Sequence, residues 1–444
     1  MVEHYLREVG AACSNHVTPI HENRSVRAVF LLLKFTYAVV VIEYCIVSIG
    51  KGEKCMNLLI HDLDEKEWGQ ISQDYQGWEV IAPSKEIKPC AGCFGCWLKT
   101  PGECVIKDGY NRMGYLIHKA DELVVMTGYT YGGFSSFVKN VFDRSIGWVL
   151  PYFRIVDNEM HHKMRYPESK KITVIFRGHD LTKEDQADAK HYVEAVCRNF
   201  NGVIKDIRFE ETTQLQEVKE SSAGQEPASD RALGKTILFN GSLRGGNSNT
   251  SKFLNKLSES IGEEAETISL VPYLNKPEEL VQTLSGANKI VLGFPMYVDG
   301  IPSEVLKVME LMEKTCPLGD KRIYTVVNMG FYESCQIKNV LRQVRKWSQK
   351  CGFTYGGGVA IGGGEMMGAL IQTINAPAGP VKYVVEALQT LGAVIGNSSA
   401  IDDIYADAYK FPRAAYMFMA GRGWPKAAKQ NGLKKKDLLR RIEN

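Results

Sequence analysis

Length, composition and charge limit the classes of protein to which this chain can belong. Its 444 residues suggest two or three domains of about 150 residues each. A hydrophobic content of 44% and a charged content of 24% are ordinary for a globular protein. The formal net charge of +3 gives no reason to expect nucleic acid or a membrane as a partner. Eleven cysteines in so long a chain indicate a reducing, cytoplasmic setting instead of a disulfide scaffold.

The first 55 residues stand apart from the rest. Residues 28–50 are apolar and long enough to span a bilayer. However, Lys34 and Glu43 lie inside this stretch, and each costs roughly 2.5–3.5 kcal/mol near the membrane centre. Residues 51–54 can be encoded by a purine-rich run that would serve as a ribosome-binding site just upstream of a start codon at Met56. We therefore interpret residues 1–55 as an upstream segment that is not native protein.

From residue 235 onward, strand and helix patterns alternate. The predicted strands are 235–240, 266–270, 289–295, 323–329 and 355–362, and an amphipathic helix follows each one. The run 289–295 is apolar throughout, as expected of a strand buried on both faces of a parallel sheet. Five strand–helix units predict a doubly wound, five-stranded parallel α/β sheet of the flavodoxin-like order 2-1-3-4-5.

Residues 56–212 repeat this rhythm. Strands are predicted at 57–61, 79–82, 123–127, 172–176 and 203–209, and helices at 112–120, 135–146 and 184–200. Residues 213–234 are polar, lack apolar periodicity and read as a linker. The chain is therefore predicted to hold two α/β domains, 56–212 and 235–444, and the second ends in a helical tail.

A glycine-rich loop, GSLRGGNSNT, follows the first strand of the second domain. Its glycines let backbone N–H groups approach an anion, and the next helix presents its positive end. The candidate phosphate donors are Ser242, Arg244, Asn247, Ser248, Asn249 and Thr250. No Gly-Lys-Ser/Thr follows, so the loop is not that of a nucleoside-triphosphate hydrolase. The alternative is a glycine-rich turn with a capping Ser or Thr.

Two further loops leave the same predicted edge of the sheet, FPMYVDGIPS and NMGFYES. Ligands of doubly wound sheets bind at this edge. Tyr297, Phe331 and Tyr332 could stack on a flat ring, and the amides of 298–300 could donate to it; aromatic loop packing is the alternative. The candidate residues of these loops are Pro295, Met296, Tyr297, Val298, Asp299, Gly300, Asn328, Gly330, Phe331, Tyr332 and Glu333.

Four cysteines crowd into a short stretch of the first domain with the spacing C-x2-C-x2-C-x7-C: Cys90, Cys93, Cys96 and Cys104. Four thiolates in a compact loop can hold a [4Fe–4S] cluster or a tetrahedral zinc ion. Unligated or redox-active thiols are the third interpretation. Elsewhere in this domain, His161 and His162 are expected in a surface connection or in a contact with the partner domain, and Asp143 and Arg144 in an internal ion pair.

Residues 234–435 resemble the NADPH-dependent FMN reductase branch of the flavodoxin-like superfamily, through GSLRGGNSNT, PMYVDGIPS and NMGFYES. The resemblance implies noncovalently bound FMN, with its phosphate on the first loop and its ring between the other two. It further implies NAD(P)H as co-substrate and a flavin, quinone or other small molecule as electron acceptor, with no catalytic side chain assigned. A flavodoxin-like electron-transfer protein without its own substrate turnover is the alternative.

Residues 56–211 resemble the same superfamily, because TYGGFSSFVKNVFDRS matches its ring loop and the helix after it. However, the first strand is followed by Asp62, Asp64, Glu65 and Glu67, which would repel a phosphate. We therefore expect one FMN per chain, in the second domain. The cysteine spacing is similar to that of the iron–sulfur flavoproteins. Because these reductases commonly dimerise, the chain is expected either to form homo-oligomers or to pair its two domains intramolecularly.

Overall fold

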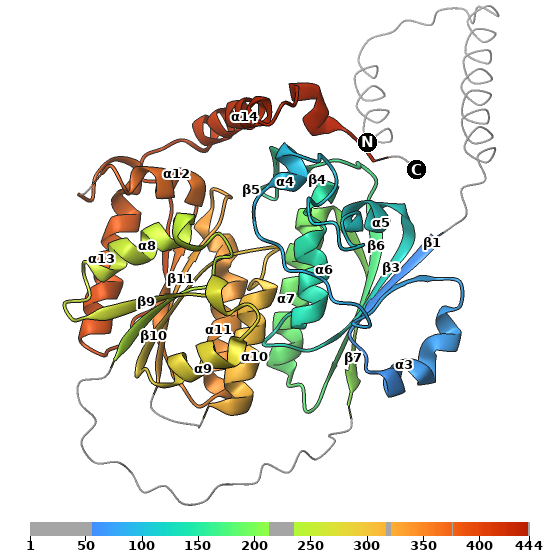
Figure 1. Ribbon diagram of the computed structural model, residues 1–444, viewed down its shortest axis with the longest axis horizontal. Coiled ribbons are helices and arrows are strands. Elements are labelled where there is room, and N and C mark those ends of the chain that lie inside the picture. The colour runs from blue at the N-terminus through green and yellow to red at the C-terminus, as the bar shows by residue number, and fades with distance from the viewer. Residues whose placement is uncertain (1–55, 213–234, 317–320, 375, 443–444) are drawn as a thin grey trace, which may run out of the picture. The chain divides into compact units, whose positions relative to one another are not determined.

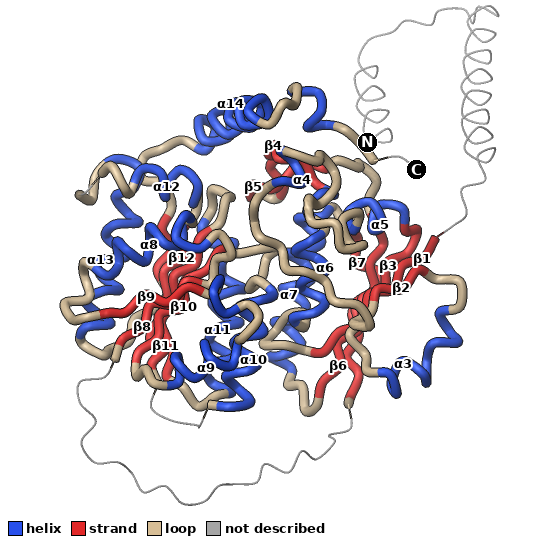
Figure 2. Tube along the Cα trace, viewed as in Figure 1, coloured by secondary structure: helices blue, strands red, loops and turns tan. Residues whose placement is uncertain are grey.

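The computed structural model describes residues 56–212, 235–316, 321–374 and 376–442, which fold around two parallel sheets (Figure 1). The predictions for residues 1–55 and for the linker 213–234 lie outside the described residues. Strands of both sheets occupy the centre of each half, and helices flank them (Figure 2). None of the described helices is long and apolar enough to cross a membrane.

The first sheet is built from the first half of the chain. In spatial order its strands are β2 (Glu79–Ile81), β1 (Met56–His61), β3 (Ala120–Gly128), β6 (Lys170–Gly178) and β7 (Gly202–Glu211). All neighbouring pairs are parallel. Counted along the sheet, this is the flavodoxin-like order 2-1-3-4-5. Its helices are α3 (Glu65–Ile71), α4 (Gly95–Leu98), α5 (Met113–Lys119), α6 (Ser136–Arg144) and α7 (Lys183–Phe200).

The second sheet has six strands, so the prediction of five was wrong. In spatial order they are β9 (Ala265–Ser269), β8 (Thr236–Asn240), β10 (Lys289–Pro295), β11 (Arg322–Asn328), β12 (Thr354–Ile361) and β13 (Ile404–Ala406). The sixth strand pairs in parallel with β12. It has three residues, too few to show a periodic pattern in sequence. The flanking helices are α8 (Asn249–Ser258), α9 (Pro277–Ser285), α10 (Ser303–Thr315), α11 (Lys338–Lys350), α12 (Gly364–Leu370) and α13 (Lys382–Gly396).

An antiparallel hairpin, β4 (Val149–Val156) and β5 (Glu159–Met164), was not predicted. Its two-residue turn consists of Asp157 and Asn158, both of which have positive φ, as a type I′ turn requires. Asp and Asn tolerate this conformation better than most residues. This dipeptide was the available sequence signal, but the flanking strands contain too many charged residues and histidines to look like core strands.

Alternating residues of the central strands supply cores on both faces of each sheet. In β8, Ile237 and Phe239 point to the core beneath α9, α10 and α11, whereas Leu238 points to the core beneath α8 and α13. In β1, Leu58 contacts the core beneath α5, α6 and α7, and Leu59 contacts a smaller core beneath α3. The second half therefore has thick helical layers on both faces, and the first half has only one.

The two halves form one compact unit, and equivalent helices pack against each other: α6 against α10 and α7 against α11. The Oγ of Ser136, the first residue of α6, donates to Glu310 Oε2 at 2.9 Å. Reciprocally, the amide of Ser303, the first residue of α10, donates to Asp143 Oδ2 at 3.1 Å. The two acceptors, Asp143 and Glu310, each lie seven positions after the first residue of their own helix. This reciprocity is the hallmark of a twofold, isologous contact, here made within one chain.

Candidate functional site

A cavity of about 440 Å³ lies at the carboxyl edge of the second sheet. Its floor consists of the loops that follow β8, β10 and β11, and the first half and the C-terminal helix α14 (Arg413–Gln430) supply its other walls. Thirteen of the seventeen predicted cofactor-binding residues line it: Ser242, Arg244, Ser248, Asn249, Thr250, Pro295, Met296, Tyr297, Val298, Asp299, Asn328, Gly330 and Phe331. The four cysteines line it as well.

The glycine-rich loop presents a set of donors at the start of α8. Ser242 and Thr250 are almost fully buried, and the Thr250 hydroxyl donates to Asn328 Oδ1 at 2.8 Å. Ser248 caps α8 by accepting from the amide of Ser251 at 3.0 Å. Among the described residues, no acceptor lies within hydrogen-bond distance of the amides of Asn249 and Thr250, the first two of the helix. These free amides, together with the Ser242 and Ser248 hydroxyls, suit a phosphate dianion.

The loop after β10 ends in a tight turn at Tyr297–Gly300, whose outer residues exchange two backbone hydrogen bonds of 3.1 and 2.9 Å. The central residues, Val298 and Asp299, have φ of 41° and 57°. Valine is β-branched and is strained in this region, and such strain is concentrated at functional sites. Within the described part of the chain, the two central amides have no backbone acceptor. They are free to donate to the edge of a flat ring.

Four predicted residues do not line the cavity. Asn247 is exposed at the end of its loop. Gly300 packs against Tyr192 of the first half, and Tyr332 donates its hydroxyl to the carbonyl of Phe411. Glu333 accepts from the amide of Met160 at 2.9 Å and pairs with Arg413 at 2.8 Å. Gly300 and Glu333 thus join the halves of the chain, which sequence spacing alone does not show.

The loop that carries the four cysteines, residues 90–104, is here called the cysteine loop. It packs directly on the turn Tyr297–Gly300, here called the ring loop of the second half. Gly92 has a φ of +61°, and a Cβ on it would lie 1.9 Å from the Tyr297 hydroxyl. Burial raises the pKa of the Cys90 thiol to about 12. The amide of Gly95 donates to Cys93 Sγ at 3.4 Å, and such bonds to sulfur tune thiolate-bound clusters. The loop therefore forms one wall of the cavity and is not a separate surface feature.

The spacing of the thiols bears on the zinc interpretation. Among the described residues, no three of these sulfurs lie within 4.8 Å of one another. A tetrahedral zinc ion with Zn–S bonds of about 2.3 Å would hold its sulfurs about 3.8 Å apart. The four thiols as placed are therefore too dispersed to surround a single ion.

Asp143 and Arg144 are both buried and ion-paired, but each with another residue. Arg144 makes a bidentate pair with Asp108, with bonds of 2.7 and 2.9 Å, and so ties α6 to the cysteine loop. Asp143 pairs with Lys139, one turn earlier on α6. Burial raises the pKa of Asp143, although the Lys139 charge opposes this. The predicted ion pair between Asp143 and Arg144 is therefore not formed. Each of the two residues pairs with another partner, and these two pairs fix the wall of the cavity.

His161 and His162 lie on β5 and contact Phe331 of the second half, so of the two expectations the contact with the partner domain agrees with the structure and the surface connection does not. His161 is 1% exposed and its ring is 5.5 Å from that of Phe331. His162 lines the cavity, with its ring 4.8 Å from Trp97 and 5.1 Å from Phe331. Burial lowers the pKa of His162 to about 3, so this ring is neutral at physiological pH. Their position depends on the β4–β5 hairpin, which the sequence pattern does not reveal.

The equivalent edge of the first sheet has a different lining. A hollow of about 390 Å³ there is bordered by Asp62, Tyr129, Ser135, Glu310 and Glu313, among others. Asp62 accepts from the Gly128 amide at 2.9 Å, and burial raises its pKa despite that bond. Burial raises the pKa of Glu310 too. No loop resembling GSLRGGNSNT borders this hollow among the described residues. Lys314, Lys350 and several hydroxyl groups line it, but so do the carboxylates of Asp62, Glu310 and Glu313.

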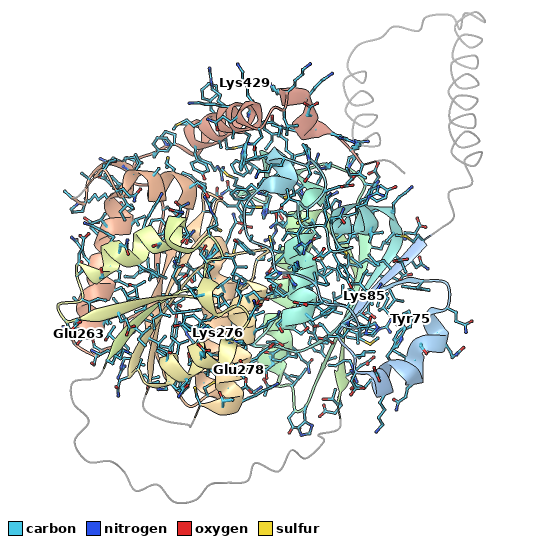
Figure 3. The ribbon with its side chains drawn as sticks, viewed as in Figure 1. Tyr75, Lys85, Glu263, Lys276, Glu278 and Lys429 are labelled. Carbon is cyan, nitrogen blue, oxygen red and sulfur yellow. The ribbon has the colours of Figure 1, made fainter. Side chains whose placement is uncertain are left out.

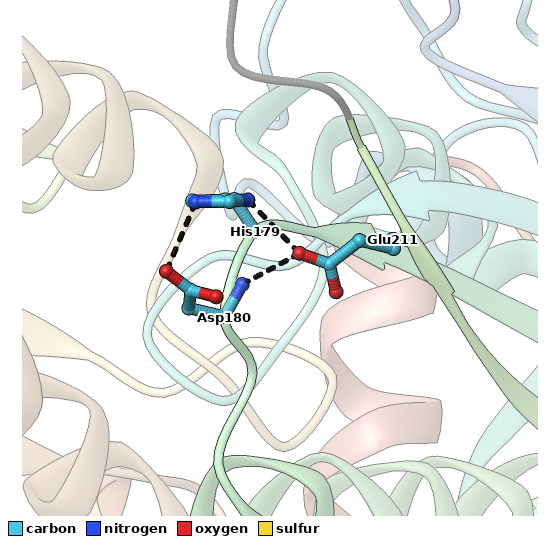
Figure 4. A group of neighbouring side chains, drawn as sticks. All are labelled: His179, Asp180 and Glu211. Atoms are coloured by element: carbon cyan, nitrogen blue, oxygen red, sulfur yellow. Dashed lines mark hydrogen bonds and ion pairs between the residues drawn. The ribbon is translucent and has the colours of Figure 1, made fainter.

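A third constellation lies at the ends of β6 and β7, where His179 is flanked by Asp180 and Glu211 (Figure 4). Nε2 of the imidazole lies 2.9 Å from Asp180 and Nδ1 lies 2.9 Å from Glu211. Because the two carboxylates face opposite nitrogens of one ring, they do not converge on a common point. All three side chains are exposed, and we interpret them as a surface hydrogen-bond network.

Comparison with known proteins returned only distant similarities. No protein-family model matches the chain, and neither does any curated protein. Among solved structures, a Trp repressor binding protein from Bacillus subtilis is 18% identical, covering 35% of this chain and 96% of its own, with a TM-score of 0.29. An FMN-dependent NADH-azoreductase from Bacillus anthracis in complex with FMN is 13% identical, covering 44% and 98%, with a TM-score of 0.20.

A flavodiiron core from Synechocystis, Flv1, is 10% identical and covers 76% of this chain and 86% of its own, with a TM-score of 0.27. Similarity at this level assigns no family. The flavodoxin-like description of the two sheets rests on their strand order and parallel pairing.

Proposed function

We propose that this protein is an FMN-dependent oxidoreductase that oxidises NAD(P)H and reduces a small acceptor such as a flavin or a quinone. One observation carries the proposal. The phosphate donors at the start of α8 and the strained ring loop at Tyr297–Gly300 open into the same cavity. This cavity lies at the carboxyl edge of the second sheet, and doubly wound sheets bind their ligands at that edge.

The residues have separate parts in this proposal. The loop 241–250 would hold the FMN phosphate, and Tyr297 and Phe331 would contact the ring. The free amides of Val298 and Asp299 would stabilise negative charge at the edge of the ring. The aromatic wall of Trp97, His162 and Phe331 would exclude water. When bound, FMN supplies the electron-accepting and electron-donating chemistry, which is why no acid–base side chain is needed.

Rapid anaerobic mixing tests the proposal. FMN-loaded protein is mixed with NADH or with NADPH, and the visible flavin absorbance is followed. We expect bleaching with at least one of the two nucleotides and recovery of the band when a quinone is added. Absence of bleaching with both would instead favour an electron-transfer protein that receives its electrons from another carrier.

The cysteine loop favours a second candidate function, electron transfer through a metal cluster beside the flavin. Its four thiols line the cavity proposed for FMN, and as placed no three of them are close enough together for a single zinc ion. We propose Cys90, Cys93, Cys96 and Cys104 as the ligands of a [4Fe–4S] cluster.

Metal analysis of protein prepared without oxygen tests the cluster. We expect iron and acid-labile sulfide in nearly equal amounts, about four of each per chain. Cys93→Ala should abolish both and leave flavin content unchanged. Cys335→Ala, the matched change at another exposed cysteine, should alter neither. Zinc in place of iron, or no metal in rigorously anaerobic protein, would contradict the assignment and leave a loop of redox thiols.

A further inference from the structure

The C-terminal segment 413–442 crosses from the second half of the molecule to the first (Figure 1). At its start, the Tyr416 hydroxyl donates to the Gly330 carbonyl at 2.7 Å. At its end, Arg165 donates to the Leu438 carbonyl at 3.0 Å, and the Ile442 amide donates to the Tyr166 hydroxyl at 3.0 Å. The segment is therefore fixed to both halves and holds α14 in place between them.

The inner face of α14 covers the cavity. Small residues at Ala420, Gly423 and Ala427 line it, together with Tyr416 and Trp424. The Trp424 ring contacts those of Phe94 and Trp97 edge to face, with centroids 5.5 and 5.3 Å apart. Packing around the cavity therefore explains the small and aromatic side chains on this face of the helix.

The outer face of α14 is the side opposite the cavity. Described residues cover it less than they cover the inner face. Phe418 is 63% exposed and Met419 54%, the two highest values among the large hydrophobic side chains described. At 100° per residue, Arg422, Lys426 and Lys429 fall on the same side of the helix as these two. All three cations are exposed, and Lys429 stands at the outer edge of the ribbon (Figure 3).

The charge of this segment differs from that of the rest of the chain. Residues 413–442 contain nine lysines and arginines and a single acidic residue, Asp437, whereas the whole chain has a net charge of only +3. The three-residue run 434–436, just after α14, adds three exposed lysines. The rest of the chain is net negative, so the cations are concentrated on one segment.

We propose that the outer face of α14, together with the lysines that follow it, binds an anionic lipid surface. Helices that lie in a membrane interface combine inserted apolar side chains with lysines and arginines that reach lipid phosphates. A protein partner suits the patch less well, because lysine is depleted at protein interfaces, whereas lysines dominate here and surround only two apolar side chains. The proposed attachment is through side chains of α14 at the lipid surface, and no described helix is long and apolar enough to cross a membrane.

This inference goes beyond the proposed function and does not depend on it. From the low net charge we predicted no membrane partner. However, a net charge does not show where the charges lie, and in this chain the cations are concentrated on one segment. Attachment through α14 would hold the cavity wall that this helix forms close to lipid. A protein that binds vesicles but does not oxidise NAD(P)H would therefore refute the proposed reaction alone.

Co-sedimentation with lipid vesicles tests the inference on the full chain. The probes are vesicles of phosphatidylcholine alone and vesicles that also contain phosphatidylglycerol. We expect binding to the anionic vesicles only, decreasing with added salt. The triple change Arg422→Glu, Lys426→Glu and Lys429→Glu should weaken binding about a hundredfold or more, since three favourable charges become unfavourable. Phe418→Ser with Met419→Ser should weaken it about tenfold.

A matched control carries the same charge change elsewhere. Lys66, Lys85 and Lys171 are exposed on the first half, and replacing all three with Glu should leave binding nearly intact if α14 is the site. The neutral change of Arg422, Lys426 and Lys429 to Gln, which is milder for folding, should give an intermediate loss. No binding by the unaltered chain would overturn the inference. So would equal losses in the control and the α14 variant, or capture of an acidic protein through α14 without any lipid binding.

Discussion

Gly92 and Tyr297 meet where the cysteine loop touches the ring loop. A Cβ at Gly92 would lie 1.9 Å from the Tyr297 hydroxyl, in a residue whose φ is +61°. Gly109 also has a positive φ, +89°, but a Cβ on it would meet no neighbouring atom within 4 Å. The two glycines therefore share a backbone requirement and differ in the space available to a side chain.

We predict that Gly92→Ala lowers the midpoint of urea unfolding clearly more than Gly109→Ala does. Both changes cost about 1–2 kcal/mol for the left-handed backbone, and only the first adds a clash. Tyr297→Phe should restore part of the stability lost in Gly92→Ala, because it removes the clashing oxygen. Equal midpoints for the two alanine variants would mean that the loops do not pack as described.

Arg244 lies at the rim of the phosphate loop, where it pairs with Glu365 at 3.2 Å. Both side chains are more than a third exposed, so this pair is weak and Arg244 can turn toward a phosphate. We predict that Arg244→Ala weakens FMN binding about ten- to a hundredfold, which corresponds to a charge-assisted bond of roughly 1.5–3 kcal/mol. Glu365→Gln removes the competing carboxylate and should leave binding equal or tighter. Fluorescence titration measures both, and unchanged affinity in Arg244→Ala would remove this residue from the site.

At the scale of elements, α7 and α11 are joined by a cluster of charges around Asp185. Its carboxylate accepts from Lys346 at 3.0 Å and from the Tyr129 hydroxyl at 2.8 Å. Burial alone would raise the pKa of Asp185, but hydrogen bonds from Thr182, Lys346 and Tyr129 outweigh it and lower the pKa to about 2. A carboxyl group whose pKa is lower in the folded state stabilises the fold above its unfolded pKa, and this contribution disappears as the pH falls toward the folded value.

We therefore predict that Asp185→Asn destabilises the protein by about 1–2 kcal/mol at neutral pH. The difference from the unaltered protein should shrink as the pH is lowered from about 4 to about 2. Glu184→Gln, next to it on α7, should have little effect because its side chain is 83% exposed. Urea unfolding at several pH values measures both. A difference that persists unchanged at about pH 2 would show that the loss came from packing.

The sequence predicted those elements whose pattern is strong and local. The central strands alternate between two cores or are apolar throughout, as in 289–295, and their positions agree with the structure within a few residues. Local patterns did not predict β13, with three residues, or the β4–β5 hairpin, whose strands carry histidines and charges. The aromatic wall was missed for a related reason. Trp97 and Trp424 become neighbours only through tertiary contacts between the cysteine loop and the tail.

At the scale of the whole molecule, two similar halves have unequal sites. Tyr131 at the ring loop of the first half enters the core of the second, and Val298 packs on the core of the first. The halves thus pair as two subunits of a dimer would, and we expect the chain to be monomeric in solution. The glycine-rich loop lines the carboxyl edge of the second sheet, whereas the hollow at the other edge presents Asp62 and Glu310 beside Lys314 and Lys350.

The most direct test of the account is the number of FMN molecules bound per chain, measured by titration of the full protein and two matched variants. Asn249→Asp places a carboxylate among the phosphate donors, where a helix N-terminus tolerates it, and should weaken binding about a hundredfold or more. Asp62→Asn, at the end of the first strand of the other half, should change nothing. We predict one FMN per chain with this pattern. Two FMN molecules per chain, or a loss of binding in Asp62→Asn but not in Asn249→Asp, would contradict the account.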